Sequence, residues 1–261
     1  AHHGGYDALV QAMSGFMSIT GPRDGDPHKV GVAIVDVLTG LQATNGVLAA
    51  LHARTDPSRF DRFRHVEVAL SDAALAGLVN VAACRVNDLE SGARWGNEHP
   101  TIVPYAPFPS ADGFVFIAVG SDGQWDKLTE ALALFEDWGD GATAERWRTN
   151  RGRVDDRERL HERLAEVTRG LSSGELENRL ARGGVPCGPI RSIEEALADL
   201  DVERRGLVVQ HADGSRTVAS PIRWGAESRP HPVGAAPPHL GSSNERIWRE
   251  FGGSERRGPA R

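Results

Sequence analysis

Apolar residues recur along the chain in two patterns that predict an alternation of helices and strands. Residues 6–20, 38–53 and 71–89 carry them at helical spacing. Residues 29–35 form a short run rich in Val and Ile, and residues 65–70 alternate like a half-buried strand. The order helix, strand, helix, strand, helix is typical of an α/β unit with parallel strands.

The middle of the chain predicts a second set of elements. Residues 94–113 contain four prolines and are expected to form an ordered loop. An alternating strand, a turn at residues 120–123 and a helix follow, and residues 140–183 are charged and mostly helical. Residues 111–205 are therefore expected to form a smaller α/β lobe.

Three shorter signals lie near the C-terminal end. Ser192 and Glu195 form a capping-box pattern, which predicts that a helix begins there. Residues 206–224 resemble a β-hairpin around the turn sequence ADGS. A further helix is expected at residues 243–251.

Composition excludes several classes of protein. The chain has 261 residues, of which 39% are hydrophobic and 25% charged, as in an ordinary globular protein. A net charge of −6 with both signs interspersed argues against a nucleic-acid partner or an anionic membrane surface. No apolar stretch is expected to span a bilayer, and no signal peptide is recognised. With two cysteines, no disulfide framework is indicated, and a cytoplasmic location is expected.

Asp36 is the candidate with the most informative position, since it follows the apolar run 30–35 where a helix is expected to begin. A carboxylate there can cap the helix by accepting hydrogen bonds from its first N–H groups. The same place suits a nucleophile, because ligands of α/β sheets bind beyond the carboxyl ends of the strands. The pattern alone leaves both interpretations open.

Other constellations are weak. The sequence has no GxSxG, Walker A, HExxH or CxxC motif, and no metal site is predicted; His2 and His3 lack partner spacing. Cys187, in a Pro/Gly turn, is expected to be an inert thiol, and His99 to form hydrogen bonds within its loop.

Six stretches in register resemble the class III CoA-transferases, the family that includes formyl-CoA transferase, carnitine-type CoA-transferases and α-methylacyl-CoA racemase. They are GYDALVQAMSG, VGVAIVDVLTGLQATNGVLAAL, HVEVALSDAAL, GNEHPTIVPYAPFPSADG, RGGVPCGPI and PPHLG. The resemblance implies an interlocked homodimer. It also implies a Rossmann-like large domain, here partial, to which residues 1–110 and 206–261 contribute, with residues 111–205 as a smaller α/β domain.

The resemblance also implies a mechanism. Asp36 matches the transferases' catalytic aspartate, which forms a mixed anhydride with the acyl group of a donor acyl-CoA and then an aspartyl-CoA thioester. A carboxylic acid acceptor receives the CoA, and no permanently bound cofactor is needed. Tyr6 and Leu70 match residues near the CoA. Gly96 and Asn97 are also expected to contact the CoA. They lie where a glycine loop covers the aspartate in the formyl-CoA branch, although the consecutive glycines are missing here.

Two alternatives to the transferase remain. Racemases of the family pair the aspartate with a histidine, which falls at the position of Tyr6. A tyrosine, with an ordinary pKa of about 10, is a poor replacement for that base, so the transferase is favoured. The chain also lacks the N-terminal portion that supplies most CoA contacts in the family. It is therefore also interpreted as a truncated, non-catalytic assembly partner, or as one that needs a separate N-terminal chain.

Overall fold

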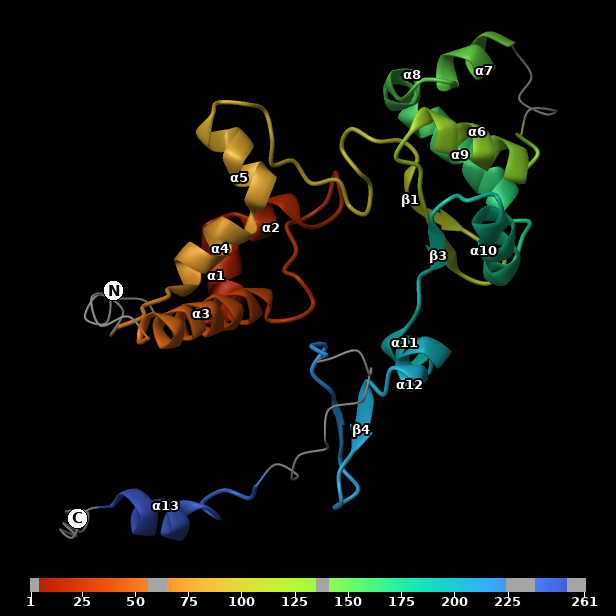
Figure 1. Cartoon of the computed structure of the whole chain (residues 1–261). Coiled ribbons are helices and arrows are strands. Elements are labelled where there is room, and N and C mark those ends of the chain that lie inside the picture. The colour runs from red at the N-terminus through yellow and green to blue at the C-terminus, as the bar shows by residue number, and fades with distance from the viewer. Residues whose placement is uncertain (1–4, 56–64, 135–140, 224–237, 253–261) are drawn as a thin grey trace. The chain divides into compact units, whose positions relative to one another are not determined.

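The computed structural model describes residues 5–55, 65–134, 141–223 and 238–252. The chain divides into two compact units, Ala1–Ile190 and Arg191–Arg261 (Figure 1). Within the described residues the fold is a mixture of helices with two small sheets, so the α/β class is confirmed at that level.

The first unit begins with a group of helices. Their bounds are α1 Asp7–Ser14, α2 Phe16–Ile19, α3 Ile34–Ala53, α4 Leu70–Gly77 and α5 Val79–Val86. Helix α4 packs against both α1 and α3 (Figure 1). Gly77 permits this approach, because a Cβ there would lie 2.7 Å from Leu38 Cδ1. The predicted helix 6–20 is interrupted at Gly15, which has a φ of 97°.

Both strands predicted in the first part of the chain are wrong. Residues 28–33 form no regular structure, and the apolar run ends inside helix α3, which begins at Ile34. Residues 65–69 are likewise irregular, and Leu70 is already the first residue of α4. β-branched residues fit a strand only when a neighbouring strand pairs with them, and no described strand lies beside either segment.

Two helix predictions in the same region also need correction. The helix expected at residues 71–89 is split into α4 and α5, and Val79, where α5 begins, has a positive φ of 46°. Ser71 and Asp72, which the sequence offers as cap residues for this helix, lie inside α4, and its N-cap residue Ala69 forms no side-chain hydrogen bond.

A three-stranded sheet follows in the order β1-β2-β3. The strands are β1 Tyr105–Pro109, β2 Phe114–Ala118 and β3 Cys187–Pro189, and both pairings are antiparallel. The expectation of parallel strands is therefore wrong for the described residues. Strand β1 was expected to belong to a loop because of its prolines, but it is an edge strand, where a residue without an N–H is tolerated.

Among the described residues, five helices accompany this sheet, and residues 141–183 of the charged segment are mostly helical, as predicted. They are α6 Asp122–Ala131, α7 Gly141–Trp147, α8 Asn150–Asp155, α9 Arg157–Thr168 and α10 Ser173–Arg182. Their apolar faces meet the inward side chains of β1 and β2 in one hydrophobic core drawn from residues 103–185. Trp125, Trp147, Leu160 and Leu164 are among its fully buried members.

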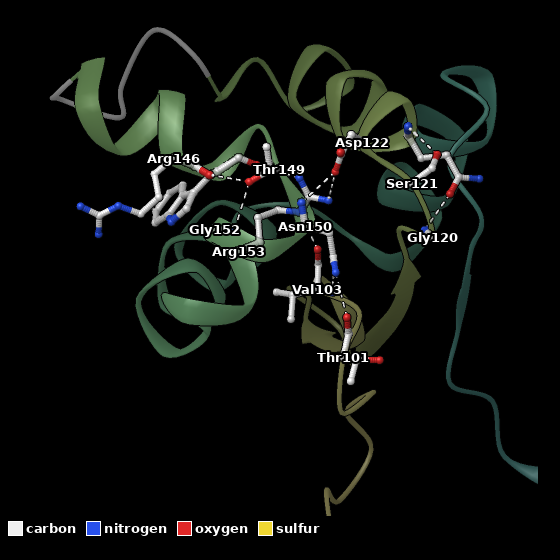
Figure 2. A network of polar contacts seen from close by, with 12 residues as sticks. Thr101, Val103, Gly120, Ser121, Asp122, Arg146, Thr149, Asn150, Gly152 and Arg153 are labelled. Atoms are coloured by element: carbon white, nitrogen blue, oxygen red, sulfur yellow. Dashed lines mark hydrogen bonds and ion pairs between the residues drawn. The ribbon is translucent and has the colours of Figure 1, made fainter. Parts of the chain in front are cut away.

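A polar network ties α6, α7 and α8 to the strand entry (Figure 2). The side chain of Arg153 is fully buried and donates hydrogen bonds to the carbonyls of Val103 and Trp147, at 2.6 and 2.7 Å. It also donates to Asp122 Oδ1 at 2.8 Å and lies over the ring of Trp125. Since a buried cation is costly unless it is paired and hydrogen-bonded, these contacts make burial of Arg153 possible.

The second unit contains short elements. They are α11 Ile193–Leu197, α12 Leu200–Arg204, β4 Val208–Gln210, β5 Arg216–Val218 and α13 Asn244–Phe251. The capping box of Ser192 and Glu195, the hairpin and the last helix are all confirmed.

Helix α3 is unusual in its composition. By length and hydropathy it is apolar enough to cross a membrane, so the expectation that no stretch approaches that length is wrong. The finding is weak evidence for a membrane protein, because core helices of soluble proteins have the same length and composition.

Candidate active site

Asp36 lies in the first turn of helix α3, and its side chain is exposed. The helix begins after Ala33, which provides no side-chain cap. The carboxylate of Asp36 forms no hydrogen bond or ion pair with any described residue. A carboxylate in this position is stabilised by the positive end of the helix dipole, yet it remains accessible to a ligand.

Asp7 performs the capping that the sequence suggested for Asp36. Its Oδ1 accepts hydrogen bonds from the backbone N–H groups of Val35, at 2.7 Å, and Asp36, at 3.3 Å. Asp7 belongs to the first turn of α1, so a neighbouring helix caps α3. The interpretation of Asp36 as an N-cap is therefore wrong, because the helix begins at Ile34 and Asp36 is already its third residue.

Gln11 completes this arrangement. It is fully buried, and its Nε2 donates to Asp7 Oδ2 at 2.6 Å while its Oε1 accepts from the N–H of Val30 at 2.9 Å. The pair thereby fixes both the entry segment and the first turn of α3. The sequence analysis missed both residues, although a Gln four positions after an Asp within an apolar helical pattern was an available signal.

Tyr6 and Leu70 lie on the helices next to Asp36. Tyr6 immediately precedes Asp7 and is the N-terminal cap residue of α1, with a largely exposed side chain. Leu70 opens α4, and its Cδ1 lies 3.4 Å from where a Cβ on Gly5 would be. Helices α1, α3 and α4 contact one another. The fold thus gathers Tyr6, Leu70 and Asp36 around one small group of helices.

Gly96 and Asn97 belong to a different place, the loop at residues 94–100. Gly96 has a φ of 59° and donates its N–H to the carbonyl of Gly21 at 2.9 Å. Arg94 donates to the carbonyls of Pro22 and Gly25, at 3.3 and 2.8 Å. No hydrogen bond or ion pair among the described residues joins this loop to Asp36.

Arg157 of helix α9 holds the other side of the loop. This guanidinium is almost fully buried and donates to Glu98 Oε2 at 3.0 Å and to the carbonyls of His99 and Pro100 at 2.8 Å. It also lies over the ring of Trp95, 4.8 Å from the centroid. The loop is therefore fixed from two directions, by the turn at residues 21–25 and by α9.

The loop borders a cavity of about 330 Å³. Its walls come from the loop, from strand β1, from helix α9 and from the turn before α3. The lining residues are Arg23, Trp95, Gly96, Asn97, Glu98, Ala106, Pro107, Phe108, Pro109, His161 and Ala165. Gly96 and Asn97, which the resemblance assigned to the CoA site, thus line a small pocket whose walls contain both polar and apolar side chains.

Two histidines near the cavity favour their neutral form. Burial lowers the pKa of His161, and nearby Glu98, 3.5 Å from its Nδ1, opposes that shift only in part. Burial and then the charge of Arg157 lower the pKa of His99. His99 Nδ1 accepts from the N–H of Thr101 at 3.2 Å, so the prediction of a loop hydrogen bond is confirmed.

Cys187 is a poor nucleophile in the structure, as expected. Burial raises the pKa of the Cys187 thiol, and its sulfur contacts the carbonyl of Glu177. A thiol with a raised pKa carries little thiolate near neutral pH. Among the residues that the structure describes, no group of three or more His, Cys, Asp or Glu side chains is placed to hold a metal ion.

Comparison with known proteins identifies the class. The family model for CoA-transferase family III matches residues 1–244, so the chain belongs to that family and the resemblance is confirmed. The chain is 40% identical over 227 residues to the succinate–glutarate CoA-transferase of Agrobacterium fabrum, covering 85% of this chain and 54% of that protein. It is 33% identical to the succinyl-CoA:glutarate CoA-transferase of Mus musculus, covering 96% of this chain and 56% of that protein.

Solved structures agree with this assignment. A CaiB/BaiF family protein from Brucella suis superimposes with a TM-score of 0.80 at 33% identity, covering 95% of this chain and 63% of the other. The chain spans about half the length of the curated relatives it matches.

Proposed function

We propose that this chain takes part in CoA transfer from an acyl-CoA thioester to a carboxylic acid, with Asp36 as the nucleophile. The observation that carries the proposal is the exposed carboxylate of Asp36 at the start of α3, left available because Asp7 caps the helix. Membership of CoA-transferase family III supplies the reaction class.

The proposed reaction requires neither ATP nor a metal ion. The Asp36 carboxylate attacks the thioester carbonyl, and CoA thiolate leaves, giving a mixed anhydride. The thiolate then attacks the aspartyl carbonyl and releases the donor acid, giving aspartyl-CoA. The acceptor carboxylate attacks this thioester and displaces the CoA thiolate, giving a second mixed anhydride. The thiolate finally attacks the acceptor's carbonyl in this anhydride, which gives the new acyl-CoA and frees the Asp36 carboxylate. Exchanging one thioester for another is nearly thermoneutral, so no further energy source is required.

The start of helix α3 is a suitable place for the proposed nucleophile. A free carboxylate is a weak nucleophile in water and gains reactivity when it is held in a fixed geometry. The two hydrogen bonds from Val35 and Asp36 to Asp7 fix the backbone that carries the nucleophile. Each tetrahedral intermediate bears an oxyanion, whose donors are proposed to lie outside this turn, because the N–H groups of Val35 and Asp36 are bonded to Asp7.

Several finer features belong to the same proposal. The resemblance supports a Rossmann-like large domain built from residues 1–110 and 206–261, with residues 111–205 as the smaller domain. It also supports an interlocked homodimer without a permanently bound cofactor, and composition supports a cytoplasmic location. Tyr6, Leu70, Gly96 and Asn97 are proposed to lie near the CoA. Dicarboxylic acids such as succinate and glutarate are the proposed acids, since the similar transferases carry their names.

The test is trapping of the intermediate. The chain is incubated with succinyl-CoA and glutarate, treated with borohydride or hydroxylamine, and mapped by mass spectrometry. We expect modification on Asp36 and loss of exchange in Asp36→Ala. Asp72→Ala is the matched control, because Asp72 is also exposed in the first turn of a helix, and it should retain exchange.

The outcomes separate the three candidate functions. Label on another residue, or exchange that persists in Asp36→Ala, contradicts the proposed nucleophile. Deuterium entering the α-position of a 2-methylacyl-CoA would favour the racemase. A folded chain without exchange, which becomes active only when a separate N-terminal chain is added, would favour the assembly partner.

A further inference from the structure

The cavity beside the loop at residues 94–100 has the size of a site for a small molecule. Its volume of about 330 Å³ lies near the lower end of the range, roughly 300–1,000 Å³, in which small ligands are bound. A complete acyl-CoA is too large for it, whereas a short-chain acid fits. The walls provide apolar contacts from Ala106, Pro107 and Phe108 of strand β1 and from Ala165 of α9.

One positively charged side chain at the cavity is placed to pair with a ligand. Arg23 is the only positively charged side chain among the lining residues. Glu98, the lining carboxylate, is already paired with Arg157 at 3.0 Å. The one described ion pair of Arg23 is with Glu158 at 3.6 Å, and that carboxylate is 87% exposed. Such an exposed pair contributes little and is readily exchanged for another carboxylate.

Arg23 is also held in place before any ligand arrives. Its guanidinium carbon lies 4.9 Å from the centroid of Trp95, over the ring. Trp95 in turn contacts Arg157, whose position is fixed by three hydrogen bonds. A guanidinium that is already oriented loses less freedom when it forms paired hydrogen bonds with a carboxylate.

The same contacts disfavour a cationic ligand. Two guanidinium groups already lie over the ring of Trp95. A further positive charge at this ring would be repelled by both, and the Glu98 carboxylate is neutralised by Arg157. The pattern of one oriented cation above an apolar wall therefore suits an anion with a short apolar body.

We propose that this cavity binds a short-chain carboxylic acid, with Arg23 recognising a carboxylate and strand β1 contacting the carbon chain. Assigning this acid as the acceptor in CoA transfer rests on the proposed function. Because Arg23 is the one cation in the lining, the cavity recognises the carboxylate itself, so a carboxylic acid is preferred to the alcohol of equal length.

Equilibrium binding of glutarate to the full chain tests the inference. Calorimetry is performed on the wild type, Arg23→Gln, Arg23→Lys and Arg151→Gln. Arg151 is the matched control, because it is 85% exposed, pairs with Asp155 at 2.9 Å and does not line the cavity. Circular dichroism checks that each variant folds, which is expected because Arg23 is about half exposed.

Losing a charge-assisted bidentate contact should weaken glutarate binding about tenfold or more in Arg23→Gln. Arg23→Lys should recover part of the affinity, and Arg151→Gln should match the wild type. The neutral analogue 1,5-pentanediol should not compete. Equal affinity in the wild type and Arg23→Gln, or no saturable binding by the wild type, overturns the inference.

The binding assay tests the role of Arg23 and the trapping assay tests the role of Asp36, so either proposal can be contradicted without the other. Asp36→Ala should still bind glutarate, because Asp36 does not line the cavity. Arg23-dependent binding without any adduct on Asp36 would contradict only the proposed function. An adduct on Asp36 together with glutarate affinity that does not depend on Arg23 would contradict only the inference.

Discussion

Among the described residues, those between 103 and 185 bury most of their large apolar side chains, whereas those between 5 and 92 leave many of theirs exposed. The first region has a core in which Trp125, Trp147 and Leu164 are almost completely covered. In the second, helix α3 is apolar along its length, yet Leu41 and Leu48 are each 58% exposed. Both regions form regular helices, so helix formation alone does not distinguish them.

The difference lies in where each helix finds its packing partner. In the described part of residues 103–189 the helices face a sheet from the same segment, and their apolar stripes meet it. Helix α3 carries apolar residues around most of its circumference, a composition typical of a helix that is buried on several sides. The described residues of the chain cover only one side of it, chiefly through α4. Exposed apolar residues that lie together on one face are typical of interaction sites in proteins.

The largest expected contrast comes from one substitution in each region. Leu164→Ala should lower the free energy of unfolding by about 2–5 kcal/mol, because it opens a cavity in a closed core. Leu48→Ala, on the exposed side of α3, should change it by less than about 0.5 kcal/mol in this chain. Urea denaturation of both variants measures the difference. Equal destabilisation would show that the two regions are equally covered in solution.

Removal of the buried cation gives a similar but smaller effect. Arg153→Met should cost about 3 kcal/mol, because the carbonyls of Val103 and Trp147 lose their donor inside the core (Figure 2). The loss of Asp122 as a partner adds little, since that carboxylate is partly exposed. The exposed Arg151→Met is the control for the same measurement and should be nearly neutral. A neutral Arg153→Met would contradict the stabilising role of the network.

The helical region depends on a polar contact instead of a core. Asp7→Ala removes the acceptor for the N–H groups of Val35 and Asp36, and should cost about 1–2 kcal/mol. Hydrogen exchange in the first turn of α3 should accelerate. Asp7→Asn keeps an acceptor oxygen and should lose less. Unchanged exchange in Asp7→Ala would show that Asp7 does not cap α3 in solution.

The smallest effect is a dependence of stability on pH at the edge of the core. The pKa of His161 is lowered in the folded state, so below its ordinary value of 6.5 the unfolded chain binds a proton that the folded chain does not. Stability is therefore complete above pH 6.5 and falls as pH is lowered from there toward the folded pKa. The slope contributed by one group is at most about 1.4 kcal/mol per pH unit.

Denaturation at several pH values between 7 and 5 measures this slope. His161→Gln should reduce it. Some slope should remain, because the pKa of His99 is lowered as well. Identical slopes in the wild type and His161→Gln would contradict the assignment, whereas His99→Gln should preserve the part that is due to His161.

Much of the local structure was predictable from the sequence. The helices of residues 140–183, the hairpin and the capping box at Ser192 follow from spacing and turn chemistry within a few residues. The family also followed from short motifs, and the match over residues 1–244 confirms it. Asp36 was selected because of its place at the start of a helix, which the structure retains although the capping role belongs to Asp7.

What the sequence by itself determined is therefore the approximate position of most helices, the local turns and the family of the chain. These depend on hydrogen bonds and apolar contacts between residues that are close in the chain. The tertiary structure decided which apolar runs became strands, which carboxylate caps α3, and that residues 21–25, 95–98, 106–109 and α9 enclose one cavity. Strand pairing, remote capping and cavity walls join residues tens of positions apart, and no local pattern specifies which distant segments will meet.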